Sequence, residues 1–77
     1  MDILEARQLI SEAIDRNDHP KSVIMLMRDA SYKCRDSLDL DQFFAQTHDL
    51  WTKFKKIHGV QKLRILNDEL RNGNTSI

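Results

Sequence analysis

Residues 40–57, LDQFFAQTHDLWTKFKKI, carry the clearest helical pattern in this chain. Side chains suited to a core recur in it at spacings of three and four residues, which places them along one side of an α-helix. Asp39 followed by Gln42 predicts where the helix begins, because the two residues can each accept the other's backbone N–H. Gly59 predicts where it ends, since glycine readily takes the left-handed conformation that closes helices. The stripe consists of Leu40, Phe43, Phe44, Thr47, Leu50, Trp51, Phe54 and Ile57.

Three further segments are predicted to be helical. Residues 3–16 and about 60–71 each align their apolar side chains on one side, and a segment from Pro20 to residue 33 or 34 begins with the residue type favoured in a first turn. Asp18 or His19 is expected to cap that segment. No segment alternates apolar and polar residues as a strand does. The sequence therefore predicts an all-α protein, a small bundle of three to four short antiparallel helices, the lower number applying if the chain continues through Gly59 with a kink.

The chain of 77 residues is long enough for one domain. We expect residues 1–73 to form this domain and residues 74–77 to be a flexible C-terminal tail. A domain this short buries only about 60% of its unfolded surface, so it needs reinforcement. The single cysteine, Cys34, excludes an internal disulfide, and no Cys/His spacing matches a structural metal site. Self-association as a homodimer or other homo-oligomer is the reinforcement that remains.

Residues 23–27, VIMLM, are five consecutive apolar residues and therefore point in every direction around a helix axis. Three of them fit one buried stripe, but Ile24 and Met25 fall outside it. They either pack under a neighbouring helix or form an exposed patch that meets another chain. Phe43 and Phe44 raise a related question, because adjacent residues differ by about 100° around a helix and one ring is expected to be only partly covered. We take Ile24, Met25 and Phe43 as candidate partner-binding residues.

Positive charge is concentrated in residues 53–64. The net charge of the chain is zero, yet residues 1–52 carry six Lys/Arg against ten Asp/Glu, while residues 53–77 carry six against two. Such a segment can bind nucleic-acid phosphates or an acidic protein surface. The alternative is a solvated helix face near a C-terminus, where the helix dipole favours cations. The five candidate residues are Lys53, Lys55, Lys56, Lys62 and Arg64.

The chain contains no motif that indicates catalysis. His19, His48 and His58 have no ligand or nucleophile partner at a helical spacing, and the common phosphate-loop, nucleophile-elbow and metalloprotease patterns do not occur. We predict that the protein is not an enzyme and uses no cofactor or metal. The expected function is a non-catalytic protein-protein interaction module, a small adaptor or inhibitor that binds and modulates a larger protein. The alternative is a small nucleic-acid-binding regulator that uses residues 53–64.

The expected location follows from two patterns that the sequence does not show. It has no charged n-region followed by an apolar h-region, and its longest apolar run is far shorter than a membrane span. We therefore expect a cytoplasmic protein that does not bind membranes.

Overall fold

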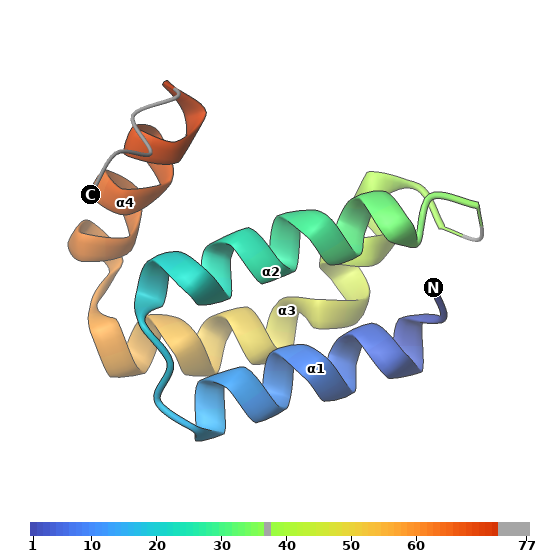
Figure 1. The fold of residues 1–77 in the computed structure, drawn as a ribbon, viewed down its shortest axis with the longest axis horizontal. Helices are drawn as coiled ribbons and strands as arrows, with labels where there is room; N and C mark the ends of the chain where they lie inside the picture. Colours follow the sequence, from blue (N-terminus) through green and yellow to red (C-terminus); the bar gives the residue numbers. More distant parts are fainter. Residues whose placement is uncertain (37, 73–77) are drawn as a thin grey trace.

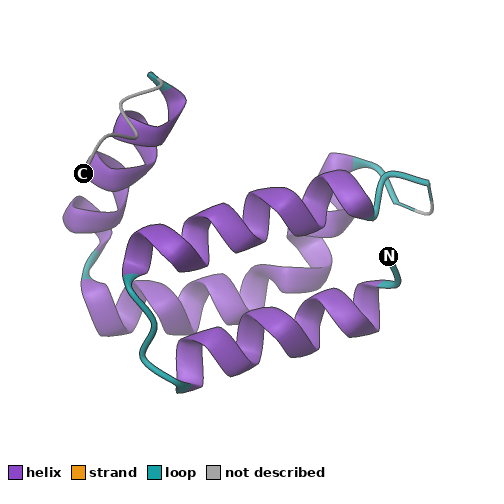
Figure 2. Ribbon diagram, in the orientation of Figure 1, coloured by secondary structure: helices purple, strands orange, loops and turns teal. Residues whose placement is uncertain are grey.

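The computed structural model describes residues 1–36 and 38–72. They form four helices, α1 (Ile3–Asp15), α2 (Pro20–Lys33), α3 (Leu40–His58) and α4 (Val60–Arg71). Helices α1, α2 and α3 lie side by side, and α4 turns away from them across one end (Figure 1). The described ranges contain no strand (Figure 2), so the all-α prediction is confirmed. None of the described helices is long and apolar enough to cross a membrane.

The position of α4 differs from a simple bundle. It lies across the end of the other helices instead of alongside α3 (Figure 1), so an antiparallel arrangement of all four helices is not confirmed. Gly59 ends α3 with a φ of 85°, a conformation that glycine readily takes, and the chain then turns into α4. The described residues therefore form four helices and not three. The tail expected at residues 74–77 lies outside the described residues.

Local side-chain hydrogen bonds set the starts of the two central helices. The Asp39 carboxylate accepts the Gln42 N–H at 2.8 Å, and the Gln42 side chain accepts the Asp39 N–H at 3.0 Å, so the predicted capping box is confirmed. At α2 the cap is His19, whose Nδ1 accepts the Lys21 N–H at 3.1 Å. Each cap satisfies a backbone donor that the helix itself leaves unpaired.

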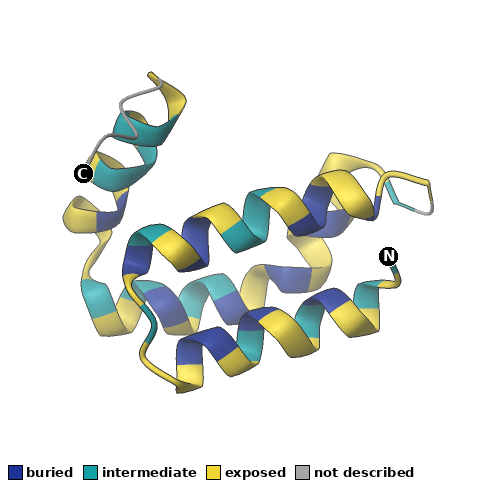
Figure 3. Ribbon diagram, in the orientation of Figure 1, coloured by how far each residue is buried: buried dark blue, intermediate teal, exposed yellow. Residues whose placement is uncertain are grey.

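The core fills the space between α1, α2 and α3, whose facing sides are buried (Figure 3). Phe43 and Phe54 are its largest fully buried side chains. Helix α4 contributes one fully enclosed residue, Leu63. The buried apolar residues are Ala6, Ile10, Ala13, Ile14, Val23, Ile24, Ala30, Cys34, Phe43, Leu50, Phe54 and Leu63.

Two ion pairs connect α1 with α3. The Arg7 guanidinium binds both carboxylate oxygens of Asp49, at 2.7 and 2.8 Å, and Lys53 binds Asp15 at 2.7 Å. The hydrogen bonds from Arg7 hold the pKa of Asp49 at about 2, below its usual 3.8. Helix α1 therefore packs against α2 and α3, and α4 contacts the same two helices elsewhere.

Candidate binding groove

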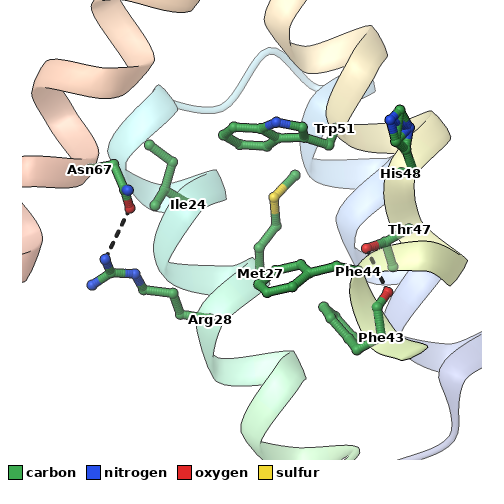
Figure 4. A pocket seen from close by; sticks show the side chains of 9 residues that line it. All are labelled: Ile24, Met27, Arg28, Phe43, Phe44, Thr47, His48, Trp51 and Asn67. Carbon is green, nitrogen blue, oxygen red and sulfur yellow. Dashed lines mark hydrogen bonds between the residues drawn. The ribbon is translucent and has the colours of Figure 1, made fainter. Parts of the chain in front are cut away.

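An open pocket of about 420 Å³ lies between α2, α3 and α4 (Figure 4). Helix α1 contributes none of its lining residues, which come from two neighbouring turns of α2, a longer stretch of α3 and one position of α4. The lining residues are Ile24, Met27, Arg28, Phe43, Phe44, Thr47, His48, Trp51 and Asn67.

The helical repeat explains why these side chains meet. On α3, Phe44, His48 and Trp51 follow one another at spacings of four and three residues, so they share one side of the helix. Met27 of α2 lies between the rings of Phe44 and Trp51 (Figure 4). Phe44 is 55% exposed, while Met27 and Trp51 are half-buried. The second apolar side of α3 therefore remains largely open to solvent.

A second hollow of about 220 Å³ continues the pocket between α3 and α4. Its lining residues are Trp51, Lys55, Val60, Leu63, Arg64 and Asn67. Trp51 and Asn67 line both hollows, so the two adjoin at these side chains. We call the two hollows together the groove. The Trp51 ring also packs against Phe54 of the core, with ring centroids 5.8 Å apart, which connects the groove to the most buried part of the fold.

Three polar side chains of the first hollow take part in hydrogen bonds within the fold. The Thr47 hydroxyl donates to the Phe43 carbonyl at 2.9 Å, and the Arg28 guanidinium donates to the Asn67 side-chain oxygen at 2.9 Å (Figure 4). Both contacts reduce the cost of placing polar atoms beside apolar ones. The first hollow thus combines apolar side chains with Thr47, Arg28 and Asn67, which are held by hydrogen bonds.

The structure places the three candidate partner-binding residues in different surroundings. Ile24 and Phe43 are 3% and 1% exposed and belong to the core, and both also line the first hollow. Ile24 takes the first of its two expected arrangements, packed under its neighbours. Phe44, and not Phe43, is the partly covered ring, because the side of α3 that carries Phe43 faces the core. Met25 is 53% exposed, as expected for a surface residue, but it does not line the groove.

The basic segment is divided among different surroundings. Lys53 is paired with Asp15, on the side of α3 that faces α1. Lys55 and Arg64 line the second hollow of the groove, and Lys56 and Lys62 are exposed and line neither hollow. The five cations therefore have three different surroundings. The edge of the Phe54 ring packs against His58, with ring centroids 4.9 Å apart.

Several groove residues were not singled out from the sequence as binding residues. Phe44 and Trp51 were assigned to the core stripe of α3, and Met27 to that of α2. The signal that could have identified them is the width of the apolar stripe of α3. Its eight residues cover a wider arc around the helix than one neighbouring helix can bury. Arg28 and Asn67 carry no sequence signal, since their meeting depends on the direction of α4.

The residues 1–36 and 38–72 include no group of three or more His, Cys, Asp and Glu side chains placed to hold a metal ion. Cys34 is a buried free thiol. Comparisons of the chain with protein-family models, with curated proteins and with solved structures gave no match.

Proposed function

We propose that this protein is a non-catalytic interaction module, a small adaptor or inhibitor that binds a larger protein through the groove. The observation that carries the proposal is the exposed Phe44 ring beside half-buried Met27 and Trp51. Contiguous apolar surface with aromatic and methionine side chains is typical of protein interfaces. Methionine adds the ability to adapt to a partner's shape.

The chemistry of the groove supports binding over catalysis. Thr47 and Arg28 are engaged with neighbouring groups of the fold and do not converge on a position where a reacting atom could sit. A cytoplasmic location is part of the proposal, and the buried single cysteine, Cys34, is compatible with the reducing conditions there.

The test compares the proteins captured from the native host by the unmodified chain and by Phe44→Ser. Phe44→Ser removes an exposed ring of the groove, and Leu4→Ser is the matched control, because Leu4 is 70% exposed on α1 and does not line the groove. We expect a partner that the unmodified chain and Leu4→Ser retain and that Phe44→Ser loses. Far-ultraviolet circular dichroism shows that both variants are folded. A partner retained equally by Phe44→Ser would contradict the proposal.

The alternative, a nucleic-acid-binding regulator, has less support. Neutralising several phosphates at once needs cations on one face, and Lys53 is already paired while Lys55 and Lys56 have different surroundings. We expect no specific duplex binding by the unmodified chain at physiological ionic strength. A tight complex with DNA or RNA that weakens steeply with added salt would favour this alternative.

A further inference from the structure

We propose that the occupant of the groove is an amphipathic helix of another protein that carries carboxylates beside its apolar face. This inference rests on the proposed function and adds the chemical class of the partner. Three features of the groove lead to it: its shape, its charge, and the mismatch between the groove and the outer face of the chain's own α1.

The shape of the groove fits an extended occupant. Phe44, His48, Trp51 and Lys55 lie on successive turns of α3, and at 1.5 Å per residue the stretch from Phe44 to Lys55 measures about 16 Å, or three helical turns. Sites for small molecules enclose most of their ligand. Here Phe44 and Val60 are each more than half exposed. A shallow apolar channel of this length suits a helix that inserts side chains at i, i+3, i+4 and i+7.

The charged side chains that line the groove are all positive. They are Arg28, Lys55 and Arg64, and neither hollow has an aspartate or glutamate among its lining residues. None of the three takes part in the ion pairs found among residues 1–36 and 38–72. Arg28 is half-buried, and its hydrogen-bond partner is the neutral amide of Asn67. A partly desolvated guanidinium of this kind gains a stronger, charge-assisted contact from a partner's carboxylate.

Acidic residues near these cations are engaged elsewhere or face solvent. Asp29, next to Arg28 in sequence, pairs with Lys33, and Glu69 of α4 pairs with Lys21. Asp68, one turn beyond Arg64, is exposed and does not line the groove. The positive charge of the groove is therefore not neutralised by the fold, and an acidic partner is electrostatically complementary to it.

The exposed side of α1 from a second copy of this chain is a poorer fit. Helix α1 exposes Leu4 and Leu9 beside Glu5 and Glu12, which is the right charge. The two leucines are five residues apart, however, and so lie about 140° apart around the helix. They cannot enter one channel together. The inner apolar side of α1 is already buried in the core.

The experiment uses the fluorescence of Trp51, the single tryptophan of the chain, which lines both hollows. The probe is a capped synthetic peptide of about fourteen residues, with leucines at the i, i+3, i+4, i+7 spacing and glutamates at most other positions. A second peptide has lysines in place of the glutamates. We expect a saturable change in Trp51 emission with the glutamate peptide and binding at least about tenfold weaker with the lysine peptide.

Two double variants test the role of the groove cations. Lys55→Glu/Arg64→Glu should weaken the glutamate peptide by about tenfold, mainly through slower association. Lys56→Glu/Lys62→Glu makes the same change in charge at exposed positions outside the groove and should stay within about twofold of the unmodified chain. Circular dichroism confirms that both are folded.

Equal binding of the two peptides, equal losses in the two double variants, or no saturable response up to about millimolar peptide overturns the assignment. It is also overturned if Trp51 emission changes with the chain's own concentration and the peptide is excluded, because a second copy then fills the groove. The proposed function is judged separately. If the peptides fail while Phe44→Ser still loses its captured partner, the groove binds a partner of other chemistry; if Phe44→Ser loses nothing, the proposed function fails as well.

Discussion

Replacing Phe43 and Phe44 separately by alanine tests which side of α3 faces the core. The two residues are of the same type and adjacent in the same helix. The difference between the losses of stability in the two variants therefore reports how deeply each ring is buried. Phe43 is 1% exposed and Phe44 is 55% exposed. Their rings also pack edge to face, with centroids 6.0 Å apart, so each substitution removes that contact equally.

The expected free energies follow from the buried areas. A fully buried phenylalanine removes about 150–250 Å² of surface from solvent. Truncating it to alanine costs about 3–5 kcal/mol once the resulting cavity is included. Phe44 buries less than half of its surface, which scales to about 1–2 kcal/mol, and the higher helix propensity of alanine favours both variants alike. The two variants should therefore differ by about 2.5 kcal/mol, or roughly seventyfold in the unfolding equilibrium constant.

The assay is urea unfolding followed by far-ultraviolet circular dichroism and by Trp51 fluorescence, whose coincidence checks two-state behaviour. A chain of 77 residues has a total stability of about 4–12 kcal/mol, so Phe43→Ala can abolish folding. In that case Phe43→Leu and Phe44→Leu, which preserve more volume, give the same ranking with a smaller gap. Equal losses at the two positions would refute the reasoning and would mean that α3 is rotated about its axis relative to this structure.

Three further predictions concern other parts of the fold. Because the pKa of Asp49 in the folded protein is about 2 and its usual value is 3.8, the Arg7–Asp49 pair stabilises the fold above about pH 3.8 and loses that contribution as the pH falls toward 2; Asp49→Asn should therefore flatten the acid side of the urea-midpoint profile. Gly59→Ala should lower the melting temperature by about 4–8 °C, because the φ of 85° strains an L-residue even with nothing within 4 Å of the added Cβ; an unchanged melting temperature would contradict this. We expect the chain to self-associate, and sedimentation at tens of micromolar protein would test this. Of the two α2 candidates, Ile24 is buried within the chain and Met25 is exposed, so Met25 is the one available for contact with a second copy. A monomer at this concentration would contradict the expectation.

The helices could be predicted because their signals are local. Pro20, the Asp39–Gln42 capping box and Gly59 each act on the backbone within a few residues, and the structure places helix ends beside all of them. The direction of α4 could not be predicted. It depends on how the residues after Gly59 pack against α2, through contacts such as Lys21 with Glu69, and helical spacing carries no information about that packing.

Only part of the groove could be predicted from the sequence, because helical spacing does not tell how the helices pack against one another. Spacing shows that Phe43 and Phe44 face different directions, but it does not say which of them faces the core; in the structure Phe43 is buried and Phe44 is exposed. Similarly, the cations of residues 53–64 are one cluster in sequence. In the fold Lys53 turns to Asp15 while Lys55 and Arg64 face the groove, because neighbours on α1 and α4 separate them.

The ion pairs between α1 and α3 bear on how the chain acquires its structure during synthesis. Arg7 and Asp49 are 42 residues apart, and Lys53 and Asp15 are 38 apart, so both pairs close large loops. When α1 and α2 have left the ribosome, the aromatic residues Phe43 and Phe54 that complete their packing are still inside it or not yet made. The N-terminal half therefore emerges with Ile10 and Val23 unshielded, and it becomes stable only after most of α3 has left the ribosome.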